Sequence, residues 1–249
     1  MFFTNKAWRL VATNKSNKRG NFKMSKLLNV FVGFDQKEAI AYHTFVQSII
    51  ETSTVPLSIT PLAENNLNEY SEKHTDGTNK FTYSRFLVPY LMNFKGWAIF
   101  VDGDMVCLSD FKNLKQFFDS KLAVSVVKHD YKTKQKVKYF GQKNEDYPRK
   151  NWSSVIIWNC EHPKNKVLTP SFINNKEGSF LHRFQWLKDN EIGELPKSWN
   201  WLAIEYEETN NVDLIHYTLG TPCFKEYSNK SFSKYWKKSY VSLLTGKED

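Results

Sequence analysis

Two carboxylates separated by one glycine directly follow an apolar run near the middle of the chain. Residues 98–101 read Ala-Ile-Phe-Val, and Asp102, Gly103 and Asp104 come next. Four apolar residues in a row predict a buried strand, and ligands of open α/β sheets gather at the carboxyl ends of the strands. Side chains alternate along an extended segment, so Asp102 and Asp104 would point the same way. Two such oxygen ligands suit Mn²⁺ or Mg²⁺.

An Asp-Gly-Asp triplet is also typical of an ordinary turn with solvated acids. The triplet alone therefore does not identify a metal site, and the secondary structure predicted around it has to be considered. Apolar runs predict further strands at 27–34, 57–60, 122–128, 152–160, 192–195 and 212–217. Helical patterns lie at 36–51, 81–91, 179–190 and 231–244. This alternation predicts an α/β fold with a mostly parallel central sheet and helices on both faces. We expect one domain over 27–249, preceded by a basic, disordered tail over 1–26.

The composition narrows the class of partner without choosing one. The net charge of +9 favours anionic partners: a phosphorylated ligand, nucleic acid or anionic lipid. No apolar run approaches the roughly 18 residues of a membrane span, and the first residues lack a signal sequence, so we expect a cytoplasmic protein. The basic, aromatic segment 234–238 suits peripheral contact with a membrane. The three cysteines are far apart and predict neither a zinc site nor a disulfide framework.

Two further strand ends are expected at the same edge of the sheet as the carboxylates. Asp35 follows the first strand, where it suits either a helix N-cap or a ligand. His216 ends the last strand, where it is either a packed side chain or a metal ligand. Arg85 falls in the first turn of a predicted helix, where a cation needs a carboxylate or phosphate partner, and Asp102 is one candidate.

At this point the chain resembles a known family. The matching stretches are 30–35, 83–89, 100–106, 153–159 and 215–220, and they occur in the order in which that family has them. On these residues the chain is similar to nucleotide-sugar-dependent glycosyltransferases of the GT-A fold, closest to family 8. The resemblance implies a single Rossmann-like GT-A domain and a donor such as a UDP-sugar. It also implies Mn²⁺ or Mg²⁺ and transfer with retention of configuration.

The resemblance also implies roles for individual residues. Asp102, Asp104 and His216 would hold the metal, with Asp102 also able to contact the donor ribose. Asn159 would lie beside the transferred sugar and would act in catalysis together with the two aspartates. The remaining donor-binding residues would be Gly33, Phe34, Asp35, Arg85 and Gly103.

The acceptor side is less clearly defined by the sequence. A hydroxyl of a glycan, a lipid-linked glycan or a protein is the expected acceptor, with Trp152, Asn200 and Trp201 as contacts, although packing in the core would equally explain the two tryptophans. The chain also departs from the family after His216. The Lys-Pro-Trp element that often follows is absent, and Lys225 is the nearest lysine that could hold the diphosphate.

Two other functions compete with this interpretation. A haloacid dehalogenase-type phosphatase also has an apolar strand followed by Asp-x-Asp, with Asp102 as nucleophile and Asp104 as acid/base. That fold has the motif on its first strand, whereas here the strand and helix of 27–51 come before it. The basic charge and the aromatic residues suggest a nucleic-acid binder, but no nucleic-acid motif is recognisable, and we expect no nucleic-acid partner.

Overall fold

A six-stranded sheet forms the centre of the protein, here a computed structural model that describes residues 27–138, 141 and 143–246. The predicted tail over 1–26 lies outside the described residues. In spatial order the strands are β2 (Leu57–Leu62), β1 (Leu28–Gly33), β3 (Trp97–Val101), β6 (Val155–Asn159), β5 (Val124–Val126) and β7 (Ile192–Glu194). Only β6 runs antiparallel to its neighbours in this sheet, so the prediction of a mostly parallel sheet is confirmed.

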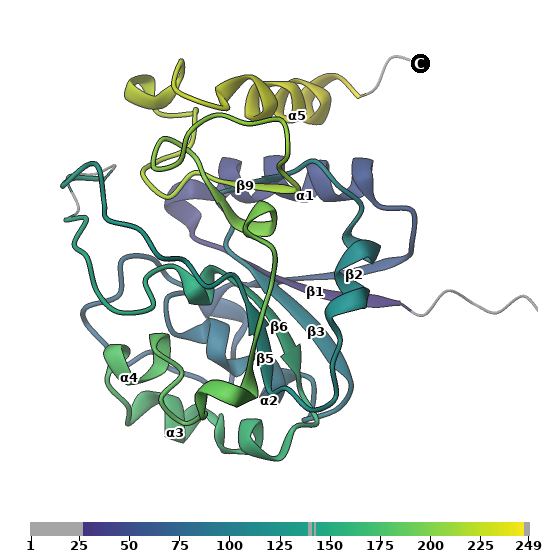
Figure 1. Cartoon of the computed structure of the whole chain (residues 1–249), viewed down its shortest axis with the longest axis vertical. Helices are drawn as coiled ribbons and strands as arrows, with labels where there is room; N and C mark the ends of the chain where they lie inside the picture. Colours follow the sequence, from purple (N-terminus) through teal and green to yellow (C-terminus); the bar gives the residue numbers. More distant parts are fainter. Residues whose placement is uncertain (1–26, 139–140, 142, 247–249) are drawn as a thin grey trace, which may run out of the picture.

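Both faces of the sheet are buried, because side chains alternate along each strand. In β1, Val30 and Val32 face the helix α1 (Ala39–Thr52), whereas Phe31 packs in the cluster on the opposite face. That opposite face is covered by three short helices, α2 (Val88–Leu91), α3 (Pro170–Asn174) and α4 (Gly178–His182). The structure is thus one α/β domain with helices on both faces, as predicted (Figure 1).

Two predicted helices are shorter than expected. The segment predicted as a helix over 81–91 is a 3-10 turn at Ser84–Leu87 followed by α2, and Pro89 sits in the first turn of α2 instead of bending a longer helix. Proline is tolerated there because the first N–H groups of a helix have no partner in the helix. The helix predicted over 179–190 ends as α4 at His182, and Phe184 has a φ of 53°.

A second, three-stranded sheet brings the last part of the chain to the first sheet. Its order is β4 (Met105–Cys107), β9 (Leu214–His216) and β8 (Trp201–Leu202). β4 follows the Asp-Gly-Asp triplet and pairs with β9 in antiparallel fashion, which places Met105 opposite His216. This pairing brings His216 beside the two carboxylates, although more than a hundred residues separate them in the sequence.

The C-terminal helix α5 (Ser233–Thr245) lies against α1 and covers the second sheet (Figure 1). Trp236 is buried in a cluster with Tyr217 and Phe232, whereas Lys234, Lys237 and Lys238 are exposed. The tryptophan of the segment predicted to contact a membrane therefore packs inward. No helix among the described residues is long and apolar enough to cross a membrane.

Candidate functional site

The Asp-Gly-Asp triplet links the two sheets through a bend between β3 and β4 instead of continuing as an extended strand. The Asp102 N–H donates to the Ser154 carbonyl oxygen at 3.0 Å, which anchors the start of the bend to β6. A Cβ atom at Gly103 would lie 2.3 Å from the Gly33 carbonyl oxygen. Gly103 thus lets the triplet approach the end of β1 closely, which accounts for this glycine through packing between backbones, whereas a Cβ atom at Gly33 would meet the Phe81 ring.

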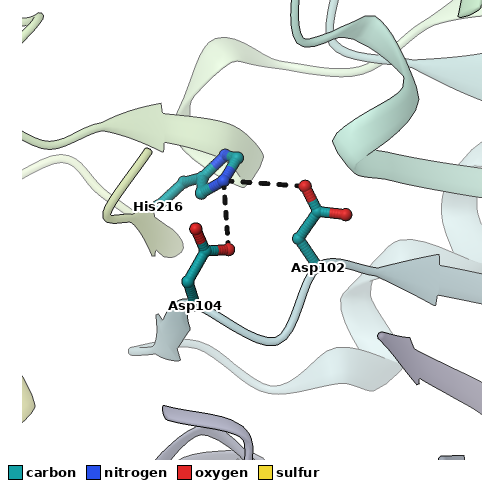
Figure 2. Close-up of side chains that lie close together, drawn as sticks. All are labelled: Asp102, Asp104 and His216. Carbon is teal, nitrogen blue, oxygen red and sulfur yellow. Dashed lines mark ion pairs between the residues drawn. The ribbon is translucent and has the colours of Figure 1, made fainter. Parts of the chain in front are cut away.

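Asp102, Asp104 and His216 converge on one point although they come from two sheets (Figure 2). The His216 Nε2 atom lies 3.2 Å from Asp104 Oδ1 and 3.7 Å from Asp102 Oδ2. One ligand atom from each residue lies within 4.8 Å of the other two. His216 is buried because its strand β9 is the central strand of the second sheet.

Asp102 is also bound from its other side by Arg85. The Arg85 Nη1 atom lies 2.8 Å from Asp102 Oδ1 and donates to the Ser153 carbonyl oxygen at 2.9 Å. The guanidinium lies over the Phe81 and Phe100 rings, at 5.4 and 5.0 Å from their centroids. The predicted pairing of Arg85 with Asp102 is therefore confirmed.

The two carboxylates differ in their acidity. Burial raises the pKa of Asp102, and the Arg85 charge offsets this only in part. Burial also acts to raise the pKa of Asp104, but the neighbouring His216 outweighs it and holds that pKa below its usual range.

The cluster fits a divalent cation. Asp104 Oδ1 is buried and accepts no hydrogen bond from any described residue, and a buried anionic oxygen without hydrogen bonds is costly. Two carboxylates and one imidazole supply hard oxygen donors and one nitrogen donor, a set that suits Mn²⁺ or Mg²⁺. Asp104, His216 and Asp102 would hold the ion.

The cluster opens into a cavity of about 320 Å³. One wall comes from the ends of the sheets, with Asp102, Asp104, His216 and Thr218, and the facing wall comes from 76–83 and 178–182. A second cavity of about 220 Å³ shares Thr78, Asn79 and Tyr83 with the first and reaches Asp35 at the end of β1. The two cavities therefore adjoin along the carboxyl edge of the central sheet.

The structure places the predicted donor-binding residues at different distances from this cavity. Arg85 and Asp102 line it, whereas Gly33, Asp35 and Gly103 line a narrow gap between the end of β1 and the triplet. Asp35 is an N-cap, as one of the two interpretations had it: its carboxylate accepts from the N–H groups of Lys37 and Lys80 at 2.9 and 3.0 Å. Phe34 packs edge-on against Tyr42.

Asn159 is not at the site, contrary to the expectation. Because β6 is antiparallel to β3, Asn159 pairs with Trp97 at the start of β3, and it is Val155 that lies opposite Val101. The Asn159 side chain donates to the Leu122 carbonyl oxygen at 3.0 Å, at the opposite edge of the sheet. The 3-10 turn Trp152–Ser154, which precedes β6, reaches the cavity instead, where Ser153 and Ser154 line it.

The three predicted acceptor contacts do not line either cavity. Asn200 is fully buried and hydrogen-bonded to His216, so it offers no surface to an acceptor. Trp152 and Trp201 are partly buried, with cations over their rings: Arg149 lies over Trp152, and Lys197 lies over Trp201. A role for the two tryptophans in acceptor binding stays a prediction.

Sequence reasoning missed several residues that line the cavity. His182 is hydrogen-bonded to Ser153, with 2.8 Å between Nδ1 and Oγ, and burial together with Arg85 lowers its pKa to about 3, so its imidazole is neutral. Lys138 also lines the cavity, whereas the predicted lysine, Lys225, is exposed on a 3-10 turn. No local pattern marks His182 or Lys138, since both lie outside the strand ends on which the prediction relied.

Comparison with known proteins relates most of the chain to a curated protein. Protein CDI of Arabidopsis thaliana is 41% identical over 220 residues, which cover 85% of this chain and 85% of that protein. The chain belongs to the CDI family. No protein-family model matches the sequence.

Solved structures that resemble this CDI-family chain are glycosyltransferases. The bifunctional glycosyltransferase WbbM matches with a TM-score of 0.63 at 15% identity, over 89% of this chain and 50% of WbbM. GlyE of Streptococcus pneumoniae matches with a TM-score of 0.57 at 12% identity, over 87% of this chain and 62% of the GlyE chain. The galactosyltransferase LgtC matches with a TM-score of 0.53 at 10% identity, over 89% of this chain and 98% of the LgtC chain. The chain thus spans about half of WbbM, and these similarities show that it has the GT-A fold.

Proposed function

We propose that this CDI-family chain is a metal-dependent glycosyltransferase that moves a sugar from a nucleotide-sugar to a hydroxyl of a glycan, lipid or protein. The observation that carries the proposal is the cluster of Asp102, Asp104 and His216, which opens into a cavity at the carboxyl edge of a GT-A sheet. The nitrogen of His216 favours Mn²⁺ over Mg²⁺. When bound, the ion neutralises charge that develops on the departing diphosphate.

The two adjoining cavities suit the two halves of a nucleotide-sugar. The first holds the metal cluster and would take the diphosphate and the sugar. The second, which reaches the end of β1 and Asp35, would take the nucleoside, and UDP is the nucleotide that the family 8 resemblance implies. Thr218 supports a polar ligand in the first cavity, because its buried hydroxyl has no hydrogen-bond partner among the described residues.

The carboxylates of the first cavity favour retention by front-face attack of the acceptor hydroxyl. An inverting reaction needs a general base, and a double displacement needs a free nucleophile. Of the described residues that line this cavity, three are carboxylates. Asp102 is paired with Arg85, Asp104 would hold the ion together with His216, and Asp76 accepts from the Tyr83 hydroxyl at 2.5 Å. These partners support the retaining outcome that the resemblance implies.

The competing functions are less well supported. A phosphatase would need Asp102 as a nucleophile, but its Oδ1 is paired with Arg85 in a buried contact. Glu205, a candidate for the second acidic motif, is occupied by hydrogen bonds from the Lys134 N–H and the Asn144 side chain. A nucleic-acid binder is supported by the net charge of +9, which equally favours a phosphorylated ligand.

Calorimetric titration of UDP into the full-length protein, with and without Mn²⁺, tests the proposal. We expect binding that requires Mn²⁺ in the wild type. In Asp104→Ala we expect binding weakened by more than the roughly 10–100-fold typical of groups behind a metal ligand. Asp119→Ala is the matched control, because Asp119 is exposed beside Ser120 and Leu122, far from the cluster, and should leave binding unchanged.

A positive titration would justify a screen of UDP-sugars for hydrolysis and transfer. If UDP does not bind, GDP and the other nucleoside diphosphates are titrated next. Failure of all of them, or metal-dependent binding that survives Asp104→Ala, would contradict the proposed site.

A further inference from the structure

Behind the metal cluster, a buried asparagine contacts the side of His216 that faces away from the carboxylates. Asn200 is 0% exposed and His216 is 2% exposed. The Asn200 Oδ1 atom lies 2.8 Å from His216 Nδ1, and Asn200 Nδ2 donates to the Asn151 carbonyl oxygen at 3.3 Å. A carbonyl oxygen can only accept, so Asn151 fixes which end of the amide faces His216. That end is the oxygen.

The orientation of this amide decides the tautomer of His216. A neutral imidazole has one N–H, and facing an amide oxygen it must place that hydrogen on Nδ1. The lone pair is then on Nε2, the atom that lies 3.2 Å from Asp104 Oδ1 and 3.7 Å from Asp102 Oδ2. We propose that Asn200 is a positioning residue, which holds His216 in the Nδ1–H tautomer so that Nε2 can bind the cation.

The alternative tautomer would oppose metal binding. With its hydrogen on Nε2, His216 would donate to Asp104 Oδ1 and would supply the hydrogen bond that this oxygen otherwise lacks. That arrangement would satisfy the buried carboxylate without an ion and would have to be broken before an ion could enter. Asn200 disfavours this arrangement, because a neutral imidazole has a single N–H hydrogen, which cannot be on Nδ1 and on Nε2 at once. The inference rests on the proposed function only in naming the ion.

The backbone holds both partners of this contact in a fixed register. Asn200 ends the 3-10 turn Lys197–Asn200, and the next two residues form β8, which pairs Leu202 with His216 in parallel. Asn151 has a left-handed backbone with a φ of 61°, and its side chain donates to the Tyr131 hydroxyl at 2.7 Å. The acceptor of the Asn200 amide is therefore itself anchored, and the orientation of the amide is set by neighbours on both sides.

The first experiment determines the tautomer of His216 in the metal-free protein. Long-range ¹H–¹⁵N correlation NMR at pH 8 distinguishes the two nitrogens of each imidazole, and His216→Gln assigns the signal among the six histidines. We expect the Nδ1–H form of His216 in the wild type. The Nε2–H form would overturn the inference whether or not the protein binds nucleotides.

Mn²⁺ affinity then tests the consequence, with free Mn²⁺ followed by electron paramagnetic resonance in the absence of nucleotide. Asn200→Leu keeps the branched shape and the number of side-chain non-hydrogen atoms but removes the acceptor, and we expect Mn²⁺ binding to weaken about 10–100-fold. Asn200→Asp keeps an acceptor for Nδ1–H, as carboxylates do behind many metal-bound histidines, and should bind within about threefold of the wild type. Equal losses in both variants would overturn the inference.

Asn165→Leu is the matched control for loss of a buried amide. Asn165 is as buried as Asn200, but its side chain donates to the Ala123 and Asn159 carbonyl oxygens at 2.8 and 2.9 Å. It should lower the thermal midpoint while leaving Mn²⁺ affinity unchanged, and an equal loss of affinity there would overturn a specific role for Asn200. An Nδ1–H tautomer in a protein that binds neither Mn²⁺ nor any nucleotide would uphold the tautomer and overturn the proposed function.

Discussion

The two edges of the central sheet bury polar side chains in opposite ways. At the edge where β3 begins and β6 ends, the Asn159 and Asn165 amides donate only to backbone carbonyl oxygens. At the edge where β3 ends and β6 begins, Asp102 and Asp104 face charged or ionisable side chains, and Asp104 Oδ1 accepts no hydrogen bond from the described residues. Asp102 is about as buried as Asn159, but the partners of the two side chains differ.

This difference separates structural polar groups from functional ones. A buried amide that closes a loop onto backbone carbonyls has its hydrogen bonds satisfied within the fold. Charges that face one another across a cavity cost stability unless a partner or ligand compensates them. The Asp102 edge therefore has the features of a binding site, and the Asn159 edge has the features of a structural support.

The largest effect on stability should come from removing the positive charge of Arg85 at the edge that carries Asp102 and Asp104. Arg85 and Asp102 are 5% and 7% exposed, so Arg85→Met would leave a buried carboxylate with no positive partner on that side. We expect the free energy of unfolding to fall by about 3–5 kcal/mol in urea titrations. The double variant Arg85→Met, Asp102→Asn removes both charges and should recover most of this loss. A double variant no more stable than the single one would show that packing, and not charge, dominates this edge.

A smaller effect should distinguish the two edges by pH. Burial and Arg85 hold the pKa of His182 at about 3, well below the value of about 6.5 in an unfolded chain. Between these values the unfolded chain binds a proton that the folded chain does not, so stability falls as the pH falls below about 6.5. From pH 7 to pH 5 this one histidine should cost about 2 kcal/mol.

The measurement compares urea unfolding of the wild type and His182→Gln at pH 7 and pH 5. Glutamine can keep the contact with Ser153 without titrating, so the variant should lose about 2 kcal/mol less over this interval. Asn159 and Asn165 do not titrate, so the opposite edge contributes nothing to the difference. Identical losses in the two proteins would mean that His182 is already protonated in the folded state or is readily solvated.

Much of the edge that carries Asp102 and Asp104 could be predicted, because its residues follow the ends of strands. An apolar run marks a strand, and the residues that follow it lie at the edge where parallel strands end. This reasoning predicts that Asp102, Asp104 and His216 lie together, and the structure brings them together, although His216 lies on β9 of the second sheet and not on a strand of the first. The pairing of Arg85 with Asp102 is confirmed although its premise is not, because Arg85 lies in the 3-10 turn Ser84–Leu87 and not in the first turn of a longer helix.

The rest could not be predicted, because the sequence does not state the direction of a fully buried strand. Residues 155–159 are apolar enough to fit either direction, and the choice decides whether Asn159 or Ser153 lies at the site. β4 and β8 have three and two residues, too few to show alternation, and they define the sheet that positions His216. The role of Asn200 depends on a contact within that sheet, so it could only follow from the structure.

The smallest predicted effect concerns the lysine that would contact the diphosphate. Lys138 lines the first cavity. Burial lowers the pKa of its ammonium group, and the Asp104 and Asp102 carboxylates act in the opposite direction. The lysine is therefore close to the metal cluster. Lys138→Gln should weaken UDP binding in the presence of Mn²⁺ about tenfold, near the lower limit of about 1.5 kcal/mol for a charged hydrogen bond. Lys225→Gln, with the same loss of charge on an exposed turn, should change binding less than twofold. Equal losses would mean that the net charge of the protein attracts the nucleotide. A loss confined to Lys225→Gln would instead support the position predicted from the sequence and would move the diphosphate away from the edge that carries Asp102 and Asp104.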